Sequence, residues 1–96
     1  MEFRVLGSLE IWNGDRQIVL RAAKQRALMT ILVVSANQSL SIDFLVEQLW
    51  PHRAPDSAPA LIRVYVSQLR KAFERETAGG TGGLLLTRAS GYSLKV

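Results

Sequence analysis

The sequence predicts an α+β domain in which a short antiparallel sheet comes first, three helices follow, and a β-hairpin ends the chain. Three observations support this prediction. Apolar residues alternate with period two near the start, repeat with helical spacing through the middle, and alternate again after a glycine-rich stretch. The 96 residues, of which 48% are hydrophobic, suffice for one modest core, so residues 1–96 are interpreted as a single domain.

The beginning of the chain is expected to form about three short strands. Apolar side chains occur there in pairs two residues apart, as in half-buried strands: Phe3 and Val5, Leu9 and Ile11, and Ile18 and Leu20. Gly7-Ser8 separates the first two pairs, and Asn13-Gly14-Asp15 separates the second from the third. Asn-Gly is a strong hairpin signal, so the strands should pair antiparallel.

Residues 22–36 are predicted to form a buried helix, because the middle turns are apolar most of the way round. The start of this helix is basic, with cations at Arg21, Lys24 and Arg26. The helix dipole disfavours positive charge at an N-terminus. Three cations placed against that preference suggest contacts with phosphate, and the alternative is that they are solvated side chains on an exposed first turn.

A second, shorter helix is predicted to begin at Ser41 and to end at Trp50. A serine suits the N-cap, and Asp43 follows in the first turn, where an acid is favourable. Pro51 should end the helix, because the residue before a proline avoids the helical region. Residues 51–56 are then expected to form an irregular loop.

The third helix is predicted to start from a cap at Asp56 or Ser57 and to run to about Arg75. Its apolar residues fall on one side, which should pack on the core: Ala58, Leu61, Ile62, Tyr65, Val66, Leu69, Ala72 and Phe73. The other side is polar, with three cations and small or amide side chains: Arg63, Ser67, Arg70, Lys71 and Glu74, with Val64 and Gln68 along its margin. These residue types contact base edges and phosphates in a DNA major groove, and they also occur on ordinary solvated helix faces.

The end of the chain is predicted to form a β-hairpin with Arg88 at its tip. Residues 84–87 and 92–96 flank the turn at residues 88–91. In the second strand, two sets of side chains should point to opposite sides: Tyr92, Leu94 and Val96 to one, Ser93 and Lys95 to the other. The glycine-rich residues 78–83 are expected to be a flexible connector.

No residue pattern in the chain points to catalysis, so we expect the protein not to be an enzyme. The one histidine, His52, lies in the proline-rich loop, and Ser90-Gly91 lacks the flanking pattern of a nucleophile elbow. Residues 79–83 lack the lysine and the following helix of a phosphate-binding loop. The acids are scattered over different elements, and no spacing suits a metal, so no cofactor is expected.

Charge and composition narrow the choice of partner and compartment. The net charge of +4 suits a polyanionic partner, although many small domains are as basic without one. The absence of cysteine fits a reducing cytoplasm. The longest apolar run is too short to span a bilayer, and the first residues lack the pattern of a signal peptide. We therefore expect a cytoplasmic domain without membrane contact or an evident small-molecule ligand.

A helix-turn-helix followed by a β-hairpin is a winged helix, and the cations lie on the parts of that fold that meet DNA. The third helix would enter the major groove, and the hairpin tip would reach a neighbouring minor groove or the backbone. Base edges would then be contacted by Arg63, Arg70 and Gln68, with Val64 against a thymine methyl. Phosphates would be contacted by Ser67, Lys71, Thr87 and Lys24.

The chain resembles the N-terminal DNA-binding domain of the Streptomyces antibiotic regulatory proteins, which is a winged helix of the OmpR/PhoB type found in two-component response regulators. The matching segments span essentially the whole chain: Lys24 to Leu28, Asn37 with Ser41-Ile42-Asp43, Leu45 with Leu49-Trp50, Val64 to Lys71, and Thr87-Arg88 with Gly91-Tyr92. The N-terminal position of Phe3 to Gly7 favours this family over response regulators, which place a receiver domain first.

The resemblance implies a transcriptional activator of antibiotic or other secondary-metabolite genes. Such proteins bind direct repeats in double-stranded promoter DNA as a head-to-tail tandem dimer and recruit RNA polymerase holoenzyme, including its sigma factor. The resemblance implies DNA contacts by the hairpin residues Thr87, Arg88 and Tyr92. It also implies that the loop between the second and third helices contacts polymerase, here through Pro51, His52, Arg53 and Asp56.

Two features distinguish the chain within this resemblance. The position of Gln68 is more often arginine or lysine in relatives. The family usually continues into a bacterial transcriptional activation domain, which these 96 residues do not include. A winged helix used mainly for protein–protein contact is the alternative function, suggested by the apolar, proline-flanked loop around Trp50.

Overall fold

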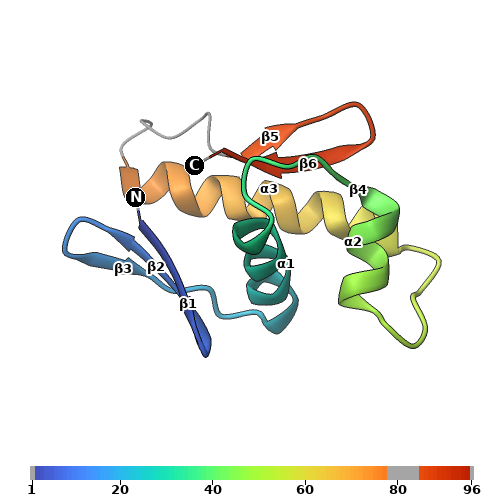
Figure 1. Ribbon diagram of the computed structural model, residues 1–96, viewed down its shortest axis with the longest axis horizontal. Coiled ribbons are helices and arrows are strands. Elements are labelled where there is room, and N and C mark those ends of the chain that lie inside the picture. The colour runs from blue at the N-terminus through green and yellow to red at the C-terminus, as the bar shows by residue number, and fades with distance from the viewer. Residues whose placement is uncertain (1, 78–84, 96) are drawn as a thin grey trace.

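The computed structural model describes residues 2–77 and 85–95, and it places two small sheets around three helices (Figure 1). The elements follow in the order β1 (Glu2–Leu6), β2 (Ser8–Asn13), β3 (Arg16–Ile18), α1 (Ala23–Val34), β4 (Leu40–Ser41), α2 (Ile42–Leu49), α3 (Ala58–Thr77), β5 (Leu85–Thr87) and β6 (Gly91–Leu94). The predicted α+β winged helix is confirmed. The predicted connector at residues 78–83 lies outside the described residues, as do Leu84 and Val96.

The N-terminal sheet has the strand order β1-β2-β3 and is antiparallel throughout, as predicted. Its two turns place glycines at positive φ, +89° at Gly7 and +63° at Gly14. This conformation is strained for other residues, which explains why glycine suits both turns. The third strand is shorter than the pattern suggests, because it ends at Ile18, and Leu20 is buried from the loop that follows.

The outer face of this sheet is polar and lies apart from the helices. Arg4 donates two hydrogen bonds to the Glu2 carboxylate, at 3.2 and 3.1 Å, and its guanidinium lies 5.6 Å from the centre of the Trp12 ring. The Arg4 guanidinium lowers the pKa of the Glu2 carboxyl through these hydrogen bonds and its charge. On the other face, the Phe3 ring meets the Phe73 ring edge-on at 6.4 Å and so joins the sheet to α3.

Helix α1 is buried on one side only, which corrects the predicted all-round burial. Leu28, Met29 and Leu32 are fully buried, but Val34 is 71% exposed at the end of the helix. The helix also ends two residues earlier than predicted. Asn37, in the turn that follows, has a φ of +67° and donates its backbone N–H to the Leu94 carbonyl at 2.7 Å.

The predicted boundaries of α2 are confirmed. The Ser41 hydroxyl accepts a hydrogen bond from the Phe44 backbone N–H at 3.1 Å, so Ser41 is the N-cap, and Asp43 lies in the first turn. Trp50 follows the last helical residue. The helix buries Leu45 and Leu49 against its neighbours.

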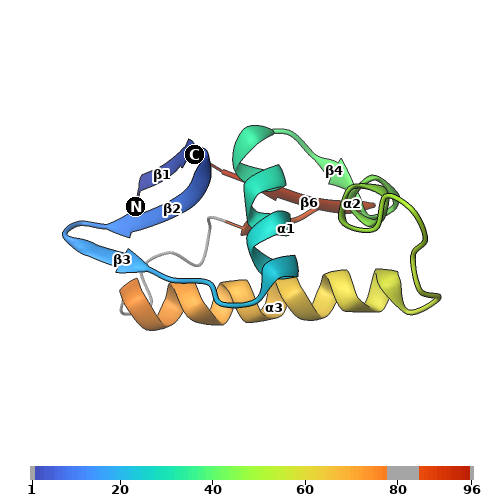
Figure 2. The same cartoon turned by 90° about the horizontal axis from the view of Figure 1, so that it is seen from below.

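Helix α3 is the longest element and extends slightly past the predicted end. Its first helical bond runs from the Leu61 N–H to the Ser57 carbonyl at 3.0 Å, which makes Ser57 the N-cap residue. The predicted inward side is confirmed, because Ala58, Ile62, Val66, Leu69 and Phe73 are all at most 2% exposed. Figure 2 shows α1 rising from α3 with its N-terminal end nearest to it.

The second sheet contains a strand that the sequence pattern does not predict. Strand β4 has only two residues and pairs with β6, so the sheet order is β4-β6-β5. Ser41 lies opposite Gly91, and the Ile42 N–H donates to the Ser90 carbonyl at 3.0 Å. This pairing joins the hairpin formed by β5 and β6 to the start of α2.

The backbones approach so closely at Gly91 that no side chain fits there. A Cβ on this residue would lie 1.8 Å from the Leu40 carbonyl oxygen and 2.8 Å from the Ser41 Cα. Both atoms belong to the backbone, so relief requires the strands to separate. The glycine is therefore required by packing and not by a turn conformation.

We expect Gly91→Ala to destabilise the domain by about 2 kcal/mol or more, since overpacking against backbone has few routes of relaxation. Thermal unfolding followed by circular dichroism should show a midpoint lowered by roughly 8 °C or more. Ser90→Ala is the matched control, because Ser90 is the exposed neighbour and the variant keeps its backbone carbonyl. Equal midpoints for the two variants would contradict the close approach.

Candidate nucleic-acid interface

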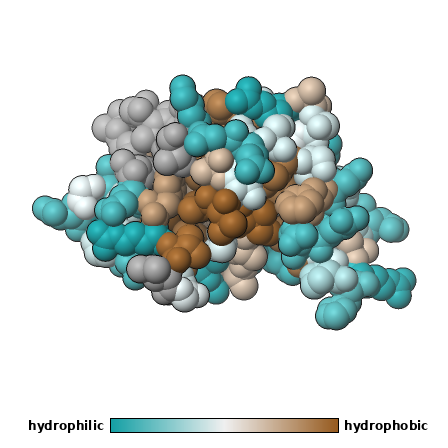
Figure 3. Space-filling view, viewed as in Figure 1, coloured by the Kyte–Doolittle hydropathy of each residue, from teal (hydrophilic) through white to brown (hydrophobic). Residues whose placement is uncertain are grey.

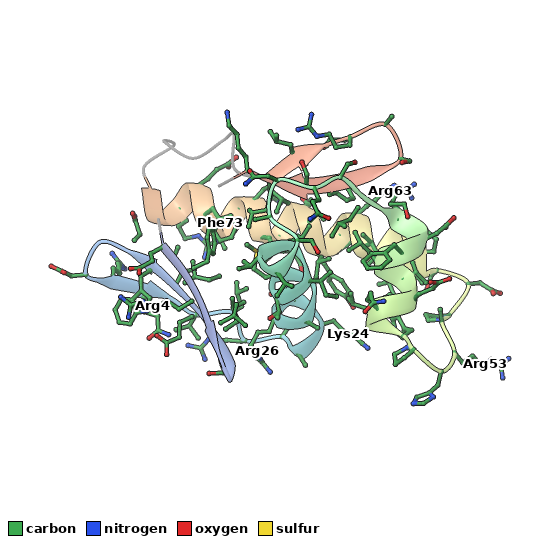
Figure 4. All side chains as sticks on the ribbon, viewed as in Figure 1. Arg4, Lys24, Arg26, Arg53, Arg63 and Phe73 are labelled. Carbon is green, nitrogen blue, oxygen red and sulfur yellow. The ribbon has the colours of Figure 1, made fainter. Side chains whose placement is uncertain are left out.

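The outward side of α3 presents a mostly polar surface, which we name the recognition face. It consists of exposed residues at helical spacing: Arg63, Val64, Ser67, Gln68 and Lys71. Val64 is 47% exposed, which is unusual for a large apolar side chain on a helix packed so tightly on its other side. These five residues lie together as the sequence predicts, and Figure 4 marks Arg63 among them.

Arg70 differs from the other predicted base-contacting residues, because its guanidinium is turned toward the hairpin. Its Nε and Nη2 donate to the Leu85 carbonyl at 3.2 and 2.9 Å, and Nη2 also donates to the Thr87 hydroxyl at 2.7 Å. The same group lies 5.9 Å from the centre of the Tyr92 ring. The described geometry thus places Arg70 as a bridge between α3 and the hairpin, and gives no support to its predicted contact with a base.

The register of the hairpin explains why Arg70 binds at Leu85. Arg88 and Gly91 exchange both backbone hydrogen bonds, at 2.8 and 3.4 Å. Hydrogen-bonded pairs alternate along an antiparallel ladder, so Leu85 and its partner Leu94 form a non-bonded pair. The Leu85 carbonyl therefore points to the free edge of the sheet, where β5 is the outermost strand. Arg70 satisfies this carbonyl and covers the edge.

The hairpin, residues 85–94, is named the wing. Its tip residue Arg88 is exposed and donates from Nε to the Ser93 hydroxyl at 3.1 Å. Ser93 is only 3% exposed, so it is buried together with its strand neighbours Tyr92 and Leu94. Tyr92 is 7% exposed and belongs to the core, so its burial leaves little surface for its predicted DNA contact, whereas Thr87 and Arg88 are exposed.

An open hollow of about 400 Å³ lies between the wing tip and the first half of α3. Its lining is mostly polar or small: Ile42, Arg63, Thr87, Arg88, Ala89, Ser90, Gly91 and Tyr92. Arg63 from the helix and Arg88 from the wing tip thus contribute to one concave surface. Two cations and the hydroxyl groups of Thr87 and Ser90 around a hollow suit a backbone phosphate.

The basic start of α1 has a structural role that the sequence pattern does not reveal. Lys24 donates from Nζ to the Leu49 carbonyl and lies 5.0 Å from the centre of the Trp50 ring. Its charge therefore lies at the C-terminus of α2, where a helix dipole favours a cation. Arg26 donates to the Leu20 and Arg21 carbonyls at 3.0 and 2.6 Å. Arg21 is exposed, and contact of these residues with phosphate stays a prediction.

The loop between α2 and α3 is exposed at every residue proposed to contact polymerase. Pro51, His52, Arg53 and Asp56 are all exposed, whereas Ala54 between them is half-buried. Figure 4 shows Arg53 extending outward from this loop, away from the helices. The loop therefore offers a free surface at the opposite end of the molecule from the N-terminal sheet (Figure 1).

One residue beside the recognition face has a role that the sequence pattern does not predict. Gln25, on the first turn of α1, donates from Nε2 to Gln68 Oε1 on the recognition face. The two residues are 43 positions apart, so no local spacing connects them. The sequence signal at Gln25 is its place in the segment Lys24 to Leu28, which matches the family.

The described residues provide no group of three or more acidic or histidine side chains that would hold a metal ion. None of the helices in the described ranges is long and apolar enough to cross a membrane.

The helix-turn-helix, its exposed polar recognition face and the wing together define a winged-helix DNA-binding domain. Residues 15–94 match the family model described as "Transcriptional regulatory protein, C terminal". The chain belongs to this family, and it is a DNA-binding domain of a transcriptional regulator. Domains of this family are generally not enzymes.

Relatives confirm the resemblance to the Streptomyces antibiotic regulatory proteins. The regulatory protein AfsR of Streptomyces griseus is 30% identical over 95 residues, which cover 99% of this chain and 9% of AfsR. The structure of Mycobacterium tuberculosis EmbR in complex with a low affinity phosphopeptide superposes with a TM-score of 0.89 at 31% identity, over 99% of this chain and 25% of EmbR.

A response regulator confirms the fold. The C-terminal domain of the nisin resistance regulator NsrR has a TM-score of 0.72 at 24% identity, over 98% of this chain and 92% of that domain. By contrast, the chain spans only between 9% and 30% of the length of the curated relatives it matches.

We expect Arg70→Ala to loosen the wing, because it leaves the edge carbonyl of Leu85 without its partner. The expected loss of stability is about 1 kcal/mol, since the guanidinium is only half-buried. Relative to the wild type, amide hydrogen exchange in the variant should become faster in the wing and should stay unchanged in α1. Arg70→Lys should behave similarly, because a lysine cannot donate in the same forked geometry.

The neighbouring cation provides the control for this experiment. Lys71 is exposed on the recognition face, and Lys71→Ala should leave wing exchange unchanged. Wing protection that is the same in the Arg70 and Lys71 variants would show that the bridge does not hold the wing.

Proposed function

We propose that this domain binds direct repeats in double-stranded promoter DNA as a head-to-tail tandem dimer and activates transcription by recruiting RNA polymerase holoenzyme, including its sigma factor. The regulated genes would serve secondary-metabolite, and specifically antibiotic, biosynthesis. The proposal draws on the family of the chain and on its similarity to AfsR, a protein of Streptomyces. The repeats would be spaced by about one helical turn, roughly 10–11 bp.

The observation that supports DNA binding best is the division of α3 into two faces. Five residues at helical spacing are almost fully buried, and the five of the recognition face are exposed. Between Arg63 and Lys71 this face has no acidic residue that would repel phosphate, and the first acid on the same side of the helix is Glu74. Helix, hollow and wing tip form one concave, positively charged surface. A helix anchored in this way can enter a major groove without rearrangement.

The residues of the recognition face are proposed to divide between bases and backbone. Arg63 and Gln68 would contact base edges, and Val64 would meet a thymine methyl. Ser67 and Lys71 would contact phosphates on the groove wall, together with Arg88 and Thr87 from the wing. Arg70 is left out of this set, because its hydrogen bonds hold the wing beside the helix.

We expect Lys71→Ala to weaken binding to specific and random duplexes alike. Loss of one phosphate contact should lower the slope of log K against log salt by about 0.9, whereas base selectivity should stay constant. Fluorescence anisotropy on a selected and a scrambled duplex at several salt concentrations measures both quantities. An unchanged slope would contradict the assignment of Lys71 to phosphate.

The loop between α2 and α3 is proposed to contact polymerase through Pro51, His52, Arg53 and Asp56. Arg53→Ala should leave DNA affinity and its salt slope at the wild-type values, since the side chain extends away from the helices (Figure 4). Transcription in a reconstituted promoter assay should fall severalfold. Full transcript levels from the variant would refute the contact with polymerase. Reduced DNA affinity would indicate that Arg53 contacts DNA instead.

A second candidate function, protein–protein contact without specific DNA binding, has its own supporting observation. Apolar atoms gather in the middle of the face seen in Figure 3, where α1 lies in front of α3. Val34 is 71% exposed and Val5 is 38% exposed, although both are large apolar residues. Equal affinity for selected and random duplexes at physiological salt would favour this function.

A further inference from the structure

We propose that Gln25 is a positioning residue for Gln68 and thereby sets the base preference at one position of the DNA site, favouring guanine over adenine. The inference rests on the proposed function, since it requires the recognition face to lie in a major groove. It concerns a residue of α1, outside the recognition face itself.

The hydrogen bond joins the half-buried side chain of Gln25 to the exposed side chain of Gln68. Gln25 is half-buried, and it donates from Nε2 to Oε1 of Gln68, which is exposed. The residues on both sides of Gln25 are held as well. Lys24 donates to the Leu49 carbonyl, and Arg26 donates to the Leu20 carbonyl at 3.0 Å. The first turn of α1 is therefore fixed by hydrogen bonds to two other segments and forms a rigid base for the glutamine pair.

The hydrogen bond orients the amide group of Gln68. Its oxygen accepts from Gln25 and so points toward α1. Its Nε2, with two hydrogens, is then the end left for DNA. An unsupported glutamine pairs well with adenine, by accepting from N6 and donating to N7. A glutamine that offers only its donor end suits guanine instead, because O6 and N7 are both acceptors.

This mechanism gives Gln25 no contact with DNA. Removal of its side chain should free the amide of Gln68 to rotate, and adenine would then be accommodated as well. Affinity for random duplex should not change, because no phosphate contact is lost. A selectivity change at constant nonspecific affinity is a result that a merely structural role for Gln25 would not produce.

The test is selection of bound duplexes from a random library with the 96-residue chain and its variants. The wild type should enrich a motif with guanine at the position lost in Gln68→Ala. Gln25→Ala should reduce the guanine-to-adenine ratio there by about fivefold or more, the size of one good base contact. The double variant should match Gln68→Ala, because Gln25 acts only through its partner.

A conservative variant tests the orientation itself. In Gln25→Glu the carboxylate cannot donate, but it can accept from Nε2 of Gln68. The amide should then turn its oxygen outward, and preference should move toward a base with an exocyclic amine in the major groove, adenine or cytosine. Gln38→Ala, an exposed glutamine in the turn after α1, is the control and should select the wild-type motif.

Several results would overturn the proposal. An unchanged motif with Gln25→Ala, a change at another base pair than Gln68→Ala, or additive effects in the double variant would each do so. Unfolding midpoints equal to wild type ensure that a changed motif does not reflect unfolding. Failure of the wild type to enrich any motif would refute sequence-specific binding itself, and this result is distinct from a failure confined to Gln25.

Discussion

The other parts of the structure depend on the packing of one side of α3 against the hydrophobic core. Ile62, Val66 and Leu69 are at most 1% exposed and are packed with residues from α1, α2 and both sheets. Phe73 extends this contact to the N-terminal sheet through the Phe3 ring. Because the inward side is held along nearly its whole length, the outward side has a fixed orientation. The recognition face thus owes its position to the core behind it.

Several cations of this basic chain make hydrogen bonds within the molecule. Arg70 joins the wing to α3, Lys24 lies at the end of α2, and Arg26 binds the segment that enters α1. Each donates to a backbone carbonyl that lies outside its own helix. A count of positive charges therefore overstates the surface offered to a polyanion. Arg63, Lys71 and Arg88 remain exposed around the recognition face and the wing, and these are the better candidates for contact with DNA.

The wing is held from two sides, which determines how it can act. Strand β4 and the close approach at Gly91 attach β6 to the start of α2, and Arg70 attaches β5 to α3. The wing and α3 are therefore held together, with the hollow beside Arg63 and Arg88 between them. Two elements held in this way would require little rearrangement on binding, so affinity would depend on the match of the DNA to their spacing.

The sequence by itself determined what depends on neighbours along the chain. Helical spacing predicts the buried side of α3, Ser41 and Pro51 predict the limits of α2, and Asn13-Gly14 predicts a hairpin, because caps and turns are local. Only the tertiary structure decided which polar side chains remain exposed. The bridge from Arg70 to Leu85 spans 15 positions and the pair of Gln25 and Gln68 spans 43, and the two-residue β4 is defined solely by its partner. Such contacts depend on how the elements pack, which residue spacing does not encode.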